Sequence, residues 1–138
     1  MERRFVRSFP AFLAGGLLVL AALLAGCTKS EPMGTVQGKV LLGGQPFSNA
    51  RLNFISKATG VATAADIESD GSFKVATPLK AGTYTVFLAP KTVADPDHPN
   101  AGTGPDPNVP QAYWNEATSP IKVEVKAGPN DIPIELKK

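Results

Sequence analysis

The chain has 138 residues, with 14 Lys and Arg against 12 Asp and Glu and a formal net charge of +2. This length suffices for one hydrophobic core and is too short for two domains of ordinary size. The charges are scattered and not gathered in a basic run, which excludes the electrostatic footprint of a nucleic-acid-binding protein. The single cysteine leaves no partner for an internal disulfide, so packing and hydrogen bonds must supply the stability.

The N-terminal segment has the pattern of a secretory signal peptide. Three arginines within the first seven positions precede an apolar run, 11–25, and small residues follow before Cys27. A positive start, an apolar middle and small residues at the cleavage point define such a signal. A retained membrane helix is the alternative, but the run is shorter than the roughly 20 residues that a spanning helix needs. A plain signal peptide with an incidental cysteine is the other alternative.

The stretch Leu24-Ala25-Gly26-Cys27 resembles the lipobox of bacterial lipoproteins. The resemblance implies cleavage before Cys27, diacylglycerol on its sulfur and acylation of the new amino group. Two acyl chains give stable anchoring where one is marginal. We therefore expect a signal peptide at 1–26, a lipidated tether at 27–34 and a folded domain at 35–138. The expected location is the cell membrane or outer membrane, facing the periplasm or exterior. The outer membrane is favoured because Thr28 is not an aspartate.

Beyond the tether, the dominant pattern is period-two alternation of apolar and polar residues, broken by Gly- and Pro-containing turns. Short alternating stretches at regular spacing predict an all-β sandwich, antiparallel and of about seven strands. The expected strands are 36–42, 51–54, 61–67, 72–75, 83–88, 121–126 and 132–137. The stretch 68–71 has hairpin chemistry, because Asp tolerates and Gly prefers positive φ. We expect the last two strands to pair with each other, and Pro133 to mark an edge strand or a bulge.

A proline-rich stretch, 89–120, interrupts this rhythm with seven prolines. Proline fixes φ and cannot donate to a β ladder, so the pattern predicts an extended surface loop. Loops of this length are usually functional or disordered. The sequence therefore predicts that ligand specificity lies in this loop.

Several turn and core motifs of the domain resemble the carboxypeptidase regulatory-like domain, which has a transthyretin-like (prealbumin-like) β-sandwich. The motifs are Val36-Gln37-Gly38-Lys39-Val40, Asp70-Gly71-Ser72-Phe73 and Ala81-Gly82-Thr83-Tyr84-Thr85-Val86. The resemblance implies a fold and not an activity. Zinc carboxypeptidases need histidine and glutamate ligands, and the chain holds one histidine. Transthyretin-like hydroxyisourate hydrolases end in a Tyr-Arg-Gly-Ser motif, which the C-terminus lacks. No enzyme activity is expected.

Two groups of side chains in the loop are candidates for binding. Asp95, Asp97, His98 and Asp106 offer oxygen and nitrogen ligands, but their spacing fits no calcium motif, so we expect a solvated loop without a metal. Tyr113 and Trp114 are aromatic candidates for contact with a sugar or a protein. The alternative is that they cap one end of the sandwich, and this is expected for Tyr113 in particular.

The sequence thus predicts a membrane-anchored cell-envelope lipoprotein, a non-catalytic binding or structural module without a cofactor beyond the lipid on Cys27. Its partners would be membrane lipid and an unknown envelope protein or glycan, with no nucleic acid. Two alternatives stay open. One is a carbohydrate-binding module using the 89–120 loop, and the other is a metal-dependent envelope enzyme or accessory.

Overall fold

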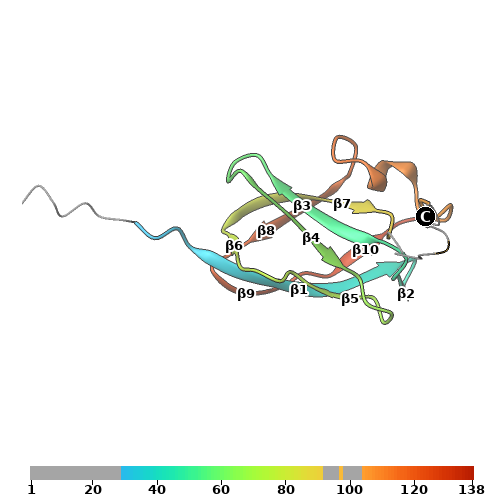
Figure 1. The fold of residues 1–138 in the computed structure, drawn as a ribbon, viewed down its shortest axis with the longest axis horizontal. Coiled ribbons are helices and arrows are strands. Elements are labelled where there is room, and N and C mark those ends of the chain that lie inside the picture. Colours follow the sequence, from blue (N-terminus) through green and yellow to red (C-terminus); the bar gives the residue numbers. More distant parts are fainter. Residues whose placement is uncertain (1–28, 92–96, 98–103) are drawn as a thin grey trace, which may run out of the picture. The chain divides into compact units, whose positions relative to one another are not determined.

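The computed structural model describes residues 29–91, 97 and 104–138, and within them the chain forms two β-sheets and one short 3-10 turn (Figure 1). The expected signal peptide and Cys27 lie outside the described residues. The elements are β1 (Met33–Leu42), β2 (Gln45–Pro46), β3 (Arg51–Ser56), β4 (Val61–Asp66), β5 (Ser72–Lys74), β6 (Leu79–Lys80), β7 (Gly82–Ala89), η2 (Gln111–Trp114), β8 (Ile121–Val125), β9 (Gly128–Asp131) and β10 (Ile134–Leu136).

The first sheet is built around β1, the longest strand. Three short strands pair with one side of β1 in antiparallel register: β6 at its start, β5 at its middle and β2 at its end. On the other side, β9 and then β10 pair with β1 in parallel register. Ile132, between β9 and β10, donates its backbone N–H to Gln37 O at 2.8 Å. The interruption at Pro133 therefore lies in an edge strand, as predicted.

The second sheet has the order β4-β3-β7-β8, and all three of its pairings are antiparallel. The tight turn after β4 carries the chain across to β5 in the first sheet. In this turn Gly71 has φ +83°, and its N–H donates to Glu68 O at 2.9 Å. A positive φ favours glycine, so the turn predicted at 68–71 forms where the sequence placed it.

The core lies between the two sheets, and both contribute the inward residues of the period-two pattern. Val36 and Val40 of β1 face the core from the first sheet, and Leu52 and Phe54 of β3 face it from the second. The rings of Phe54 and Phe73 lie 5.9 Å apart between centroids and join the two layers. Burial of each large apolar side chain stabilises the fold by about 2 kcal/mol. The predicted all-β sandwich is confirmed.

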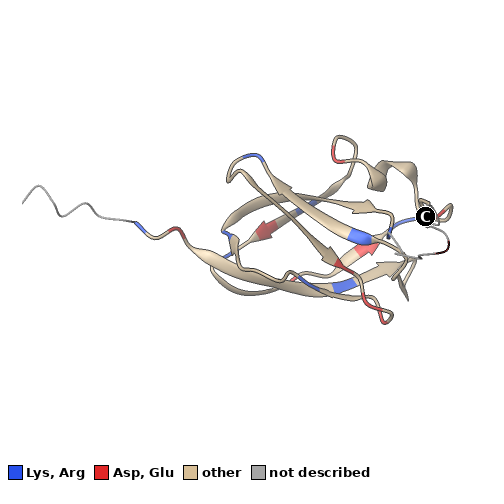
Figure 2. Ribbon diagram, in the orientation of Figure 1, with Lys and Arg blue, Asp and Glu red and all other residues tan. Residues whose placement is uncertain are grey.

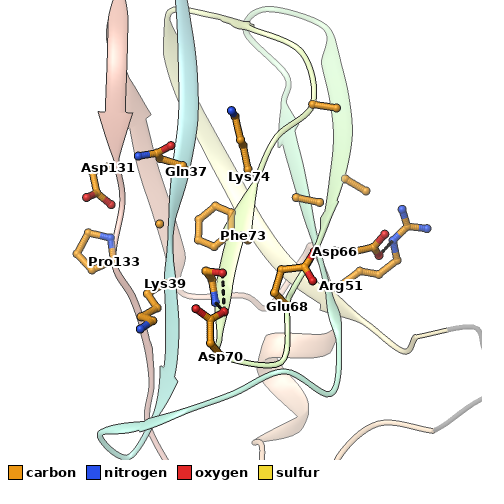
Figure 3. A pocket seen from close by; sticks show the side chains of 15 residues that line it. Gln37, Lys39, Arg51, Asp66, Glu68, Asp70, Phe73, Lys74, Asp131 and Pro133 are labelled. Atoms are coloured by element: carbon orange, nitrogen blue, oxygen red, sulfur yellow. Dashed lines mark hydrogen bonds and ion pairs between the residues drawn. The ribbon is translucent and has the colours of Figure 1, made fainter.

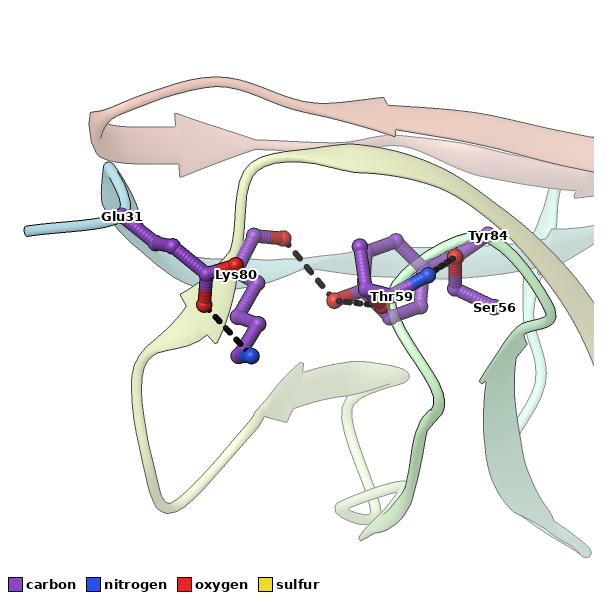
Figure 4. Close-up of polar contacts among 5 residues, drawn as sticks. All are labelled: Glu31, Ser56, Thr59, Lys80 and Tyr84. Carbon is purple, nitrogen blue, oxygen red and sulfur yellow. Dashed lines mark hydrogen bonds and ion pairs between the residues drawn. The ribbon is translucent and has the colours of Figure 1, made fainter. Parts of the chain in front are cut away.

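The N-terminal end of the sandwich, which comprises residues 31–34, 57–60, 79–82 and 126–128, is held by polar contacts (Figure 4). The hydroxyl of the buried Tyr84 donates a hydrogen bond to Lys80 O at 2.8 Å. The same hydroxyl oxygen lies 3.4 Å from Thr59 Oγ1. Lys80 also pairs with Glu31. A Cβ on Gly34 would lie 2.1 Å from Lys126 O, so only glycine allows the close approach of β1 to the turn before β9.

Four expectations differ from the structure. The described residues form ten strands and not about seven, and β9 and β10 pair with β1 in parallel and not antiparallel register. The last two predicted strands do not pair with each other: β8 pairs with β7, whereas β9 and β10 pair with β1. The alternation shows which side chains point inward but not which strand lies alongside. The 89–120 loop does span from the end of β7 to the start of β8, yet its described part from 104 onward is not merely extended. It contains η2, which packs Tyr113 against the core.

Candidate ligand-binding cleft

An open cleft of about 1120 Å³ lies between β4 and β5 and extends over outward side chains of the first sheet (Figure 3). β4 contributes Ala64, Ala65 and Asp66 to its lining, and β5 contributes all three of its residues. Its further walls come from the middle of β1 and from the residues around the β9–β10 interruption. The cleft forms because β4 and β5 belong to different sheets and diverge from the turn that joins them.

Charged side chains of both signs surround the cleft. The acidic residues are Asp66, Glu68, Asp70 and Asp131, and the basic residues are Lys39, Arg51 and Lys74. Arg51 Nε lies 3.1 Å from Asp66 Oδ1, and both side chains are about half exposed. An exposed ion pair of this kind adds under about 1 kcal/mol to stability. The charges therefore define a polar rim that a ligand can reach from solvent.

Asp70 is the most firmly oriented carboxylate of the rim. It accepts hydrogen bonds from the Ser72 hydroxyl and from the Ser72 backbone N–H, the latter at 2.9 Å. These two bonds, in that order, together with the charge of Lys39, lower the pKa of Asp70 below its usual value. The carboxylate is therefore ionised at neutral pH and fixed at one end of the cleft.

The floor of the cleft is apolar and made of small or flat groups. Phe73 and Ala65 are buried, and Ala64 and Ala76 flank them. Short side chains on the walls leave room for an extended ligand. Pockets for small molecules are usually lined mostly by apolar side chains, so this cleft suits a polar ligand better than an apolar one.

The structure places the two aromatic candidates away from this cleft, since neither lines it. Tyr113 is 8% exposed, and its hydroxyl accepts a hydrogen bond from Lys137 N at 3.2 Å. Trp114 is partly buried against the core, and its indole Nε1 lies 3.4 Å from Val109 O. Tyr113 thus packs where a structural anchor was expected. Sugar contact by Trp114 stays a prediction.

The metal candidates are only partly within the described residues. Asp95 and His98 lie outside them, and Asp97 is exposed. The Asp106 carboxylate accepts hydrogen bonds from Asn108 N and Asn108 Nδ2, at 2.9 and 3.0 Å. In the part of the chain that the structure describes, no three His, Cys, Asp or Glu side chains are grouped for a metal ion. Over the same residues, no helix has the length and apolarity to cross a membrane.

Sequence reasoning missed the cleft because its residues come from five separate segments that alternation alone does not bring together. The sequence held one local indication of the cleft. Lys39, Ser72 and Lys74 are the outward residues of neighbouring strands, and the turn 68–71 adds two carboxylates. A correct pairing of β5 with β1 would have placed them on one surface.

Comparison with known proteins adds three distant structural likenesses. No protein-family model matches the sequence, and no curated protein matches it. Among solved structures, the Bacillus anthracis TIE protein is 14% identical with a TM-score of 0.47, over 78% of this chain and 17% of its own length. DUF3823 family proteins from Parabacteroides merdae and Bacteroides ovatus are 17% and 16% identical, with TM-scores of 0.46 and 0.45. The matches cover 77% and 76% of this chain but 46% and 44% of theirs.

Proposed function

We propose that this protein is a lipid-anchored, non-catalytic binding module of the bacterial cell envelope, with the cleft between β4 and β5 as its ligand site. The lipobox-like stretch ending at Cys27 supports the anchor. The start of β1 at Met33 supports it further, because only the five residues 28–32 separate the cysteine from the first strand. At about 3.4 Å per residue, such a tether reaches roughly 17 Å and holds the sandwich close to the membrane surface.

The observation that carries the binding role is the cleft itself. It combines an accessible volume of about 1120 Å³ with seven charged side chains and a small apolar floor. By contrast, the described part of the 89–120 loop uses its best apolar residues for packing, since Val109 and Tyr113 both belong to the core. We therefore assign binding to the cleft in preference to the loop.

The ligand chemistry that fits this cleft is polar and not strongly charged. Lys39 lies close enough to Asp70 to lower its pKa, and Arg51 is paired with Asp66, so neither sign of charge dominates. Such a site suits a hydrogen-bonding glycan or an extended peptide of the envelope. A strongly anionic ligand would meet the carboxylates of Glu68 and Asp131 as well as the lysines.

The anchor is tested with Cys27→Ser against the unchanged chain, by membrane fractionation and intact mass. The unchanged protein is expected in the membrane fraction with an acyl mass increment, and the variant is expected to be unprocessed or soluble. Secretion of both proteins without lipid would overturn the anchor.

The cleft is tested by chemical acetylation of lysines, in isolated envelopes and after purification in detergent. A bound envelope ligand is expected to slow the modification of Lys39 and Lys74, which line the cleft. Lys137 is exposed and does not line the cleft, so it serves as the internal control. Equal rates for Lys39 and Lys74 in both preparations would count against the cleft as the site.

A further inference from the structure

The sheet edges of this sandwich are not equally protected against pairing with another chain. The edge formed by β9 and β10 contains Pro129 and Pro133, which have no N–H to offer. At the β8 edge, Pro120 precedes the strand and the exposed Lys122 lies within it. The short strands beside β1 have three residues or fewer. Proline, lysine and shortness are the usual means by which proteins protect an edge.

β4 lacks all three. Its sequence, Val-Ala-Thr-Ala-Ala-Asp, contains no proline, lysine or glycine over six residues. Among the residues that the structure describes, its ladder partner is β3 alone, and an isolated bridge from Ile67 to Phe73 follows its end. Ala62 and Ala64 on its outer face are too small to obstruct an incoming strand. An edge of this length and composition presents unpaired backbone groups as a template for another strand.

We propose that β4 pairs in antiparallel register with β4 of a second copy of this chain, about a two-fold axis perpendicular to the sheet. The charges at the ends of the strand favour this occupant. Lys57, just before β4, has a side chain that is 90% exposed and lies 3.7 Å from the Glu116 carboxylate. At and beyond the other end of β4 lie Asp66, which pairs with Arg51, and the carboxylates of Glu68 and Asp70. Figure 2 shows this separation, with a cationic β3–β4 turn and an anionic β4–β5 turn.

Antiparallel pairing of two identical edges places the cationic end of each copy beside the anionic end of the other. The same contact is thus made twice, as in most two-fold symmetric dimers. Between the ends, β4 has no charge from Val61 to Ala65, so no like charges are opposed. The product is a continuous sheet in which β4 is an interior strand in both copies.

The same symmetry is compatible with anchoring of both chains in one membrane. A two-fold axis perpendicular to the sheet leaves both copies of β1 on one side of the extended sheet. Both copies of β1 therefore lie in the layer on that side, and they begin at opposite ends of the dimer. The pairing also completes the cleft, because Ala64 and Asp66 line it from β4 and the partner strand would then form its outer wall.

The test uses single added cysteines on the full chain in its membrane fraction, treated with a short bifunctional maleimide. Ala62→Cys and Ala64→Cys place a thiol on the outer face of β4, and Lys122→Cys places one on the β8 edge as the matched control. Only a residue on the two-fold axis lies opposite its own copy, about 5 Å away between Cα atoms. Each position away from the axis adds about 7 Å along the strand. We therefore place the axis near the middle of β4, where Ala62 and Ala64 both lie within about 15 Å of their own copies, in reach of the reagent. We expect covalent dimers for the β4 variants, with no higher oligomers, and little product for the control.

A substitution that disrupts pairing at the β4 edge provides the second part of the cross-linking test. Ala64→Lys in the Ala62→Cys background places like charges across the axis and is expected to lower the dimer yield by up to about fivefold. Unchanged thermal melting of this variant shows that it remains folded. A monomeric Ala62→Cys protein, or a yield no higher than that of Lys122→Cys, would overturn the proposal. A cross-link to a different protein would overturn it too, by showing a foreign strand on the edge.

The chain without an added cysteine gives the background yield of cross-linked product in the same experiment. A cross-link in it would report a free thiol at Cys27 and would overturn the lipid anchor. The β4 pairing would still be decided by the excess of the Ala62→Cys yield over that background.

Discussion

The two ends of the sandwich differ in how their polar groups are used. At the N-terminal end, side chains bond to the backbone of neighbouring segments: the Tyr84 hydroxyl donates to Lys80 O, and Asn130 Nδ2 donates to Thr35 O at 3.1 Å and to Lys126 O at 2.8 Å. At the cleft end, Asp70 and Ser72 bond to each other in an exposed turn. The first arrangement fixes the strands in place, whereas the second orients a charge toward solvent. The polar contacts that hold the strands together therefore lie at one end of the sandwich, and the charged groups that a ligand can reach lie at the other.

The largest effect is expected from Gly34→Ala at the N-terminal end. The added Cβ would lie 2.1 Å from Lys126 O and 2.6 Å from Asn130 Nδ2, so β1 and the turn before β9 must separate. We expect a loss of about 3 kcal/mol in the free energy of unfolding, measured by denaturant titration. Gly104→Ala is the control, because a Cβ there meets no atom within 4 Å. Equal effects of the two changes would contradict this account of the N-terminal end.

A smaller effect is expected from Tyr84→Phe. The change keeps the buried ring and removes the hydroxyl that bonds to Lys80 O, leaving that carbonyl without its partner. A loss of about 1 kcal/mol is expected in the same titration. Tyr113→Phe gives the comparison, since its hydroxyl only accepts the N–H of the exposed Lys137 and water can replace it. The account fails if Tyr113→Phe destabilises the protein more than Tyr84→Phe.

The smallest effect is expected at the cleft end, from Asp70→Asn. Because the folded protein lowers the pKa of Asp70, the ionised carboxylate favours folding above its unfolded pKa. This contribution is lost as the pH falls through the folded pKa. Asp70→Asn should therefore lower the melting temperature slightly at neutral pH and leave it unchanged in strong acid. Glu68→Gln is the matched control, and an identical pH profile for both variants would refute the role of the Ser72 bonds.

Much of the sandwich was predictable from the sequence because alternation reports which side chains face the core. Leu52 and Phe54, or Val123 and Val125, are buried as their spacing predicts. The turn at 68–71 was predictable because Asp and Gly have specific backbone preferences.

The pairing partners were not predictable in the same way. β9 and β10 lie alongside β1, about ninety residues away, and nothing in their own sequence indicates this. The cleft depends on that pairing and on the divergence of β4 from β5, so it was missed with it. The 89–120 stretch was expected to be an extended surface loop because of its prolines, yet Pro110 O accepts the N–H of Tyr113 at the start of η2.

The pairing of the first strand with the last two has a consequence for the order of events in folding. The first sheet cannot be completed until residues 128–136 are available, because β9 and β10 form the whole of one side of β1. Contacts between such distant segments close slowly, since a long loop must be ordered first. A chain emerging N-terminus first therefore stays without its finished core until its final residues have followed.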